Sequence, residues 1–180
     1  MGKRIPELTN ELIRFIEQQK MFFVGTARSE GTVNISPKAM DSLRVIDKNT
    51  IVWLNLTGSG NETATHLLEN DRMTIMFMAF DGKPLILRLY GNAKAYHPRD
   101  EKYQECILMF PDDPGARQII VMQVNLVQSS CGYAVPFMEF KEDRNILKSW
   151  SEKQGRDRIK EYWKEKNSIS LDGFHTGIIE

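Results

Sequence analysis

Apolar and polar residues alternate with a period of two along much of this chain, which is typical of β-strands with one buried face. A further run, residues 72–80, is almost continuously apolar and rich in methionine, which predicts a strand buried on both faces. Short polar turns separate several neighbouring runs, so these strands are expected to pair as hairpins. The predicted strands cover residues 21–27, 32–36, 43–46, 51–56, 72–80, 85–96 and 119–127.

Helical spacing and local breakers complete the expected fold. Pro37 lacks a backbone N–H and is expected to end the second strand, whereas Gly91 predicts a bulge or bend that helps a barrel to curve. The strand count and the connection lengths favour a mainly β fold, a small and predominantly antiparallel barrel with added helices. Helices are expected over residues 6–20, 61–69, 98–109 and 141–166, the last broken near Gly155, with a coil tail over 168–180.

Composition narrows the classes of function. The chain has 180 residues, which suits one domain, and equal numbers of basic and acidic residues, 24 each, give no support to nucleic-acid binding by bulk charge. No run is long enough to span a membrane and no signal peptide is evident, so a cytoplasmic location is expected. Cys106 and Cys131 are expected to be free thiols. The three histidines have no metal-ligand spacing, and His66 is expected at the surface or in a capping role.

The most informative stretch is the glycine-rich corner Thr57-Gly-Ser-Gly-Asn-Glu-Thr63, between the strand at 51–56 and a helix. Free amides and the positive end of a helix dipole make such a corner attract anions, and phosphate is the expected one. The corner lacks the Gly-Lys-Ser/Thr ending of a nucleotide triphosphatase loop and the third glycine of a dinucleotide fingerprint. The alternative is a plain connecting loop with Asn61 as the helix N-cap.

Strand alternation supplies a second polar feature. Asn34 and Ser36 lie on one face of their strand, and Lys38 follows them, so one face ends in a polar row with a positive charge. Asn55 shares a face with Trp53 on the strand that leads into the corner. The alternative for the polar row is an ordinary solvated strand face.

Taken in order, these segments resemble the pyridoxamine 5'-phosphate oxidase-like family of FMN-binding split barrels. The resemblance rests on Asn34-Ile-Ser-Pro-Lys38, Trp53-Leu-Asn55, the glycine-rich corner with its helix ending in Asn70-Asp-Arg72, and the later segments 76–84, 87–93 and 130–136. It implies a split-barrel domain over residues 1–136 and a helical C-terminal extension over 137–180 packed on it. It also implies a homodimer with FMN at the subunit interface and a small-molecule substrate.

The resemblance also implies cofactor contacts. Phosphate would be held by Lys38 and the corner residues Ser59, Gly60 and Asn61. The isoalloxazine and ribityl parts would lie near Asn34, Ile35, Ser36, Leu54 and Asn55. The chain lacks the family's basic Ser-Arg-Lys sequence at the corner and its C-terminal Trp-Arg-Pro and Arg-Leu signature. A flavoprotein other than a true pyridoxamine 5'-phosphate oxidase is therefore expected.

Three functions remain open at this point. A flavin supplies hydride transfer itself, so a flavin-dependent oxidoreductase needs no acid–base pair in the sequence. The absence of an evident acid–base pair equally suits a protein that binds or senses FMN without turnover, and a haem- or deazaflavin-binding relative is a third possibility. Arg88, Cys131 and Tyr133 are candidates for the substrate side; the alternatives are an outward-facing or salt-bridged arginine and structural packing.

Overall fold

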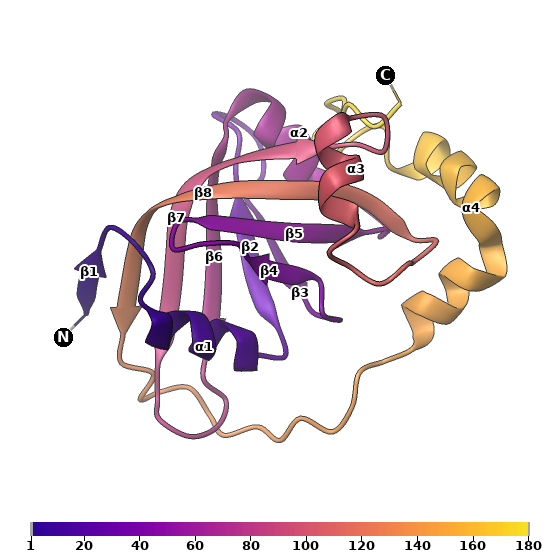
Figure 1. Cartoon of the computed structure of the whole chain (residues 1–180). Coiled ribbons are helices and arrows are strands. Elements are labelled where there is room, and N and C mark those ends of the chain that lie inside the picture. The colour runs from indigo at the N-terminus through magenta and orange to yellow at the C-terminus, as the bar shows by residue number, and fades with distance from the viewer. Residues whose placement is uncertain (1, 180) are drawn as a thin grey trace.

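A computed structural model describes residues 2–179 as one curled antiparallel sheet with helices around it (Figure 1). The sheet runs in the order β3-β2-β6-β7-β8-β5-β4, and β1 pairs with β8. It curls into a half-barrel, which confirms the predicted split-barrel architecture. The strands are β1 Lys3–Ile5, β2 Phe22–Thr26, β3 Asn34–Lys38, β4 Leu43–Val45, β5 Thr50–Leu56, β6 Arg72–Met78, β7 Ile86–Tyr96 and β8 Ala116–Ser130.

Two apolar clusters sit on opposite faces of the sheet. The larger lies inside the half-barrel, where the aromatic rings of Phe22, Trp53 and Phe77 meet. The smaller lies on the other face of β5, where Val52 and Leu54 pack with residues of α3. This division follows from the alternation of side chains along β5. The helices are α1 Asn10–Gln18, α2 Glu62–Glu69, α3 Glu101–Ile107 and α4 Ile146–Lys166.

Strand β1 was not predicted, and the other elements differ from their predicted bounds at one or both ends. Pro37 does not end the strand, because β3 continues to Lys38 with Pro37 paired opposite Phe23. Proline is tolerated there because β3 lies at the end of the sheet, where a missing N–H breaks no second ladder. Strand β8 begins at Ala116 rather than at residue 119 and extends to Ser130.

The helices begin later than predicted. The first starts at Asn10 rather than residue 6, because the Thr9 side chain accepts a hydrogen bond from the Leu12 amide and caps it. Helix α3 starts at Glu101 rather than 98, and α4 at Ile146 rather than 141. The expected break in α4 is confirmed, since Gly155 has a left-handed φ of 72°.

The predicted irregularity at Gly91 is confirmed as a register shift in the pairing of β7 with β8, between Tyr90 and Gly91. A Cβ atom at position 91 would lie 1.9 Å from the backbone oxygen of Gln123. Only glycine allows this approach, and the bulge lets the two longest strands curve together.

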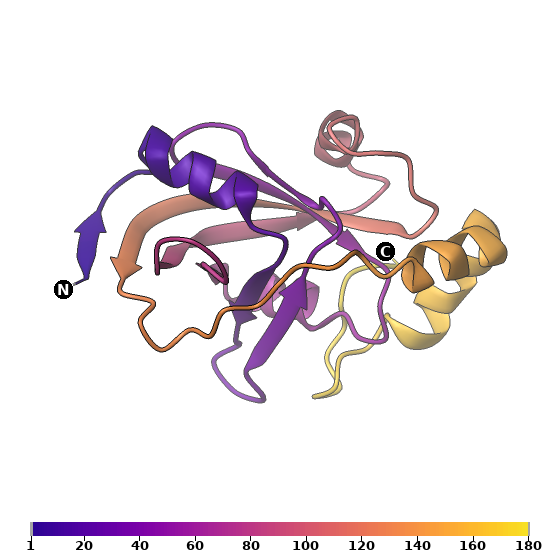
Figure 2. The ribbon, with the colours of Figure 1, turned by 90° about the horizontal axis from the view of Figure 1, so that it is seen from below.

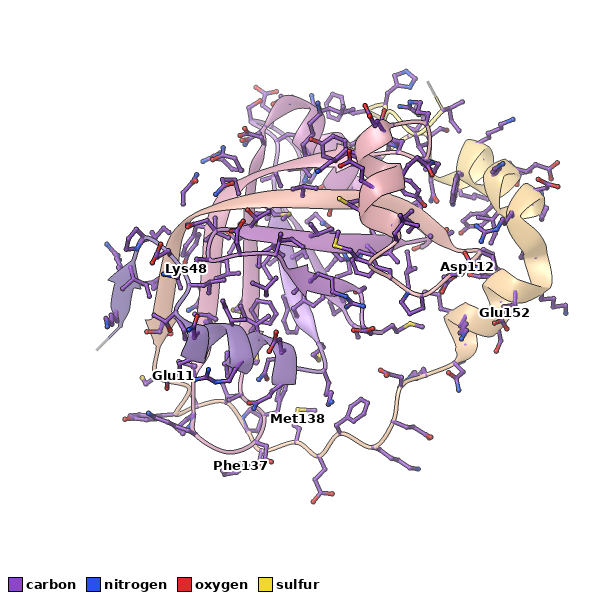
Figure 3. All side chains as sticks on the ribbon, in the orientation of Figure 1. Glu11, Lys48, Asp112, Phe137, Met138 and Glu152 are labelled. Atoms are coloured by element: carbon purple, nitrogen blue, oxygen red, sulfur yellow. The ribbon has the colours of Figure 1, made fainter. Side chains whose placement is uncertain are left out.

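The C-terminal part of the chain crosses the molecule before it becomes helical. Residues 131–145 run beneath the half-barrel as an extended connector between β8 and α4 (Figures 1 and 2). Met138 donates a backbone hydrogen bond to Phe80, whereas the Phe137 side chain points away from the body and is 83% exposed (Figure 3). Helix α4 is tied to the loop after α3 by an ion pair between Arg156 and Asp112.

Candidate anion and cofactor site

The polar row of β3 faces the inside of the half-barrel. Asn34 pairs opposite Thr26, and Lys38 pairs opposite Phe22. Directly opposite residues share a face of the sheet, and Thr26 and Phe22 are buried on the inner face. The interpretation of this row as a solvated strand face is therefore wrong: its side chains are half-buried beside the core.

Hydrogen bonds connect this row to α2, β5 and β8. Asn34 accepts from the Ser36 hydroxyl at 3.1 Å and donates to the Thr63 hydroxyl at 3.3 Å. Lys38 Nζ lies 3.5 Å from Asn55 Oδ1, and Asn55 donates to Gln118 Oε1 at 3.0 Å. We call this set of side chains the polar seam; it comprises Asn34, Ser36, Lys38, Asn55, Thr63 and Gln118.

Two cations at the seam lack a carboxylate partner. Arg117 is 2% exposed, and its guanidinium donates to two neutral acceptors, Gly60 O at 2.9 Å and Asn167 Oδ1 at 2.8 Å. Burial, together with the positive charge of Arg117, lowers the pKa of Lys38 to about 8. Burial also lowers the pKa of Arg117 to about 10. Among residues 2–179 neither cation forms a salt bridge, so the site carries uncompensated positive charge.

Several buried donors around these cations also lack partners. Within the described part of the chain, no hydrogen bond is made by Trp53 Nε1, Gln118 Nε2 or Arg117 Nε. The Lys38 ammonium lies 5.0 Å from the centroid of the Trp53 ring. Buried donors are normally satisfied. A cluster that combines open donors with positive charge has the chemistry of an anion site.

The glycine-rich corner adjoins this cluster through Arg117. Ser59 and Gly60 are exposed, and Asn61 occupies the N-cap position of α2. The Asn61 side chain forms no capping bond and instead donates to the Asn167 carbonyl at 3.4 Å. Asn61 is therefore the N-cap residue, as the connecting-loop alternative expects, although its side chain makes no capping bond. Within residues 2–179 the Asn61 side chain accepts no hydrogen bond from the first-turn amides of α2.

Other predicted residues lie apart from the seam. Ile35 points to the outer face of the sheet and is 70% exposed. The Leu54 side chain packs in the smaller apolar cluster, against residues of α3. Arg88 also lies toward the outer face, where it donates to Ser130 Oγ at 3.2 Å. Cys131 and Tyr133 are exposed at the start of the connector. Of the predicted cofactor side chains, the structure brings together those of Asn34, Ser36, Lys38 and Asn55, with the corner residues beside them.

A groove of about 720 Å³ lies on the outer face of the sheet. It is lined by Ile35 and Arg88, while Lys38, Ser59 and Asn61 do not line it. Thr26 borders the groove, and its hydroxyl lies 3.0 Å from Nδ1 of His66 on the inner side. The remaining apolar lining includes Phe23, Val33, Met73 and Met76.

Several residues in or beside the site were not predicted from the sequence. Arg117 and Gln118 lie in the part of β8 before residue 119, and a polar pair next to an apolar run was the available signal. Asn167 lies 50 residues beyond Arg117, so no local pattern could connect them. His66, expected at the surface or as a cap, is 1% exposed because α2 packs it against Thr26.

Two properties of residues 2–179 bear on other functions. No group of three or more His, Cys, Asp or Glu side chains is placed to hold a metal ion. None of the helices there combines the length and the apolarity needed to cross a bilayer.

Comparisons with known proteins agree with the fold. The family model described as pyridoxamine 5'-phosphate oxidase matches residues 8–131. A curated protein of Aspergillus flavus, pyridoxamine 5'-phosphate oxidase family protein ustO, is 33% identical over 184 residues, covering 92% of this chain and 74% of that protein. Crystallised HupZ of Group A Streptococcus superposes with a TM-score of 0.53 at 20% identity, covering 66% of this chain and 91% of that one. The chain belongs to the pyridoxamine 5'-phosphate oxidase family.

Proposed function

We propose that this protein binds FMN, with the phosphate at the glycine-rich corner and the remainder along the polar seam. The observation that carries this proposal is the pair of cations, Lys38 and Arg117, that no carboxylate balances among residues 2–179. A buried positive charge is costly unless an anion compensates it. A phosphate supplies this charge and accepts hydrogen bonds from open donors. Family membership favours a flavin mononucleotide as its source.

The residues present fit such a ligand. Lys38 and the open amides of the corner suit a phosphate, which accepts several hydrogen bonds at once. Asn34, Ser36 and Asn55 carry side chains that both donate and accept, as the hydroxyls of a ribityl chain require. Asn61 Oδ1 is buried without a partner among the described residues and can accept from a hydroxyl.

We extend the proposal to a flavin-dependent oxidoreductase that acts on a small organic substrate, other than a true pyridoxamine 5'-phosphate oxidase. A bound flavin supplies the hydride-transfer chemistry. The chain contributes binding, orientation and the positive potential of Lys38 and Arg117, which favours added negative charge on a ligand. No ion pair within residues 2–179 joins the polar seam, so that potential is not neutralised by the protein itself.

A homodimer belongs to the same proposal. Strand β3 faces inward with its polar row. Its outward residue Ile35 is 70% exposed, and Val33, just before the strand, is 71% exposed. They border the groove of about 720 Å³, where Phe23 and Met76 add apolar surface. Exposed apolar patches of this kind mark contact surfaces. We assign this face to a second copy of the chain, because the family resemblance places the flavin at a subunit interface and β3 lies between the groove and the seam.

Purified protein tests the proposal directly. Flavin absorbance after dialysis against FMN, together with a fluorescence titration, should give saturable binding of about one FMN per chain. Lys38→Met should weaken binding by at least about tenfold, since it removes a charged partner of the phosphate. Lys48→Met is a matched control, because Lys48 is an exposed lysine in the turn before β5 and pairs with Glu7. Failure of the wild-type protein to bind FMN would refute the proposal.

The oxidoreductase part needs a separate measurement. The loaded protein is mixed anaerobically with NADH or NADPH, and flavin reduction is followed by loss of absorbance near the visible maximum. Reduction followed by reoxidation with an organic acceptor supports turnover. Stable oxidised flavin with every donor and acceptor supports binding without catalysis. Extraction of any copurifying chromophore distinguishes both outcomes from a haem- or deazaflavin-binding protein.

A further inference from the structure

Asn167 occupies an unusual place behind the glycine-rich corner. It follows the last residue of α4 and is completely buried. Its side-chain amide donates to the carbonyl oxygens of Gly58 at 3.0 Å and Ser59 at 3.4 Å, and its Oδ1 accepts from Arg117 at 2.8 Å. The same Arg117 nitrogen donates to the Gly60 carbonyl at 2.9 Å. Asn167 and Arg117 therefore hold the carbonyls of Gly58, Ser59 and Gly60 together from one side.

This grip fixes the direction of the amides. In a planar trans peptide the carbonyl of one residue and the N–H of the next point to opposite sides. With the three carbonyls turned toward α4, the N–H groups of Ser59, Gly60 and Asn61 point away from it. Within residues 2–179 these three N–H groups have no hydrogen-bond acceptor, and Ser59 and Gly60 are exposed. Successive amides aimed at one point form an anion-binding concavity.

The anchoring of Asn167 makes the grip rigid. Its own carbonyl accepts from the Asn61 side chain at 3.4 Å and from the Thr176 hydroxyl at 2.5 Å. One turn earlier in α4, the Trp163 indole donates to the Thr57 hydroxyl at 2.8 Å. The end of α4 thus contacts both ends of the corner, and Figure 1 shows this end of α4 beside the C-terminal tail.

We propose that Asn167 is a positioning residue, which acts with Arg117 to aim the Ser59, Gly60 and Asn61 amides at the ligand's phosphate. This inference rests on the proposed FMN binding. It assigns the discrimination between FMN and riboflavin to the C-terminal extension, although Asn167 itself faces the protein side of the corner. Asparagine suits the role because one amide supplies both the donor for the carbonyls and the acceptor for Arg117.

Asn167→Asp provides the sharpest test. The carboxylate keeps the shape and the acceptor for Arg117, but it replaces the donor with an oxygen that repels the Gly58 and Ser59 carbonyls. The dissociation constants of FMN and of riboflavin are measured by fluorescence titration. We expect the preference for FMN over riboflavin to fall by at least about tenfold, with riboflavin affinity nearly unchanged, because hydrogen bonds to a charged phosphate are lost and the new carboxylate pairs with Arg117.

Thr176→Val is the matched control. It removes another buried hydrogen bond to Asn167 but leaves the side-chain amide of Asn167 on the corner. Its preference for FMN should equal that of the wild type even if the protein melts at a lower temperature. An unchanged preference in folded Asn167→Asp, in a wild type that does prefer FMN, overturns the role of Asn167 alone. A wild type that binds no FMN overturns the proposed function and this inference together.

A measurement on the unaltered protein covers the case in which Asn167→Asp does not fold. In amide NMR spectra of the wild type, FMN should shift the proton signals of Ser59, Gly60 and Asn61 downfield, whereas riboflavin should leave them nearly in place. This result supports the inference, because only a phosphate-directed amide distinguishes the two ligands. Equal shifts with both ligands, or none with FMN, overturn it.

Discussion

Lys38 is a half-buried, charged residue of the proposed phosphate site. Its pKa is lowered to about 8 by burial and by the positive charge of Arg117. At neutral pH the ammonium is still mostly charged, so the folded protein carries a cation that its own carboxylates do not balance. Such a site lowers the stability of the ligand-free protein and raises its affinity for an anion. The two effects can be measured separately.

Binding of FMN should depend on pH through Lys38. A bound phosphate favours the ammonium and raises its pKa above the free value of about 8. Above pH 8, binding must therefore take up a proton, and the dissociation constant should rise by up to about tenfold per pH unit. Affinity should be greatest between about pH 6, where the phosphate becomes doubly charged, and pH 8. Titrations from pH 6 to 9 test this, and Lys38→Met should lack the rise above pH 8.

In the ligand-free protein the half-buried Lys38 ammonium should lower the stability of the fold. The folded pKa of Lys38, about 8, lies below its unfolded value of 10.5, so the unfolded state binds more protons between these limits. Stability contributed by this group therefore rises as the pH increases from 8 to 10.5. At pH 7 Lys38→Met should raise the melting temperature without ligand, as measured by calorimetry, and lower the gain that FMN produces. A lower melting temperature in the ligand-free variant contradicts this reading of Lys38.

At the scale of elements, the curvature of the sheet depends on one glycine. Gly91→Ala places a Cβ atom 1.9 Å from the Gln123 carbonyl oxygen, so β7 and β8 must separate. We expect a loss of about 3 kcal/mol or more in the free energy of unfolding by urea denaturation. Gly25→Ala in β2 is the control, since its Cβ atom would meet only Thr74 atoms at 3.9 Å. Equal stability of the two variants would show that the bulge does not need glycine.

The elements were predictable to the extent that their signals are local. The alternation of apolar and polar residues predicts the strands, and Gly91 predicts the bulge, because both signals lie within a few neighbouring residues. The predicted strand end at Pro37 is wrong, because a proline can remain in a strand at the edge of a sheet. The position of β3 at that edge depends on the order of all the strands, which no local pattern shows. Lys38 and Asn61 were found from strand and corner patterns. Arg117 and Asn167 were not, since their contact joins β8 to the C-terminal end of α4.

At the scale of the molecule, the C-terminal tail and the outer groove have different roles. The tail is bound to the barrel at separated points: Thr32 donates to Asp172, and Arg99 donates to the carbonyls of Gly177 and Ile178. The tail therefore links the loop before β3 to the segment before α3. The outer face of β3 has no such cover among residues 2–179, and Val33 and Ile35 remain exposed. A second copy of the chain would bury them.

Ile35→Asp tests this assignment. A carboxylate at a buried subunit contact is strongly unfavourable, so the variant should sediment as a monomer where the wild type sediments as a dimer. If the flavin lies at that interface, FMN affinity should fall together with dimerisation, and higher protein concentration should restore both in parallel. Leu108→Asp is the control, since Leu108 is 84% exposed at the end of α3, away from the groove. A monomeric Ile35→Asp variant with wild-type FMN affinity would separate the two functions and place the whole cofactor site within one chain.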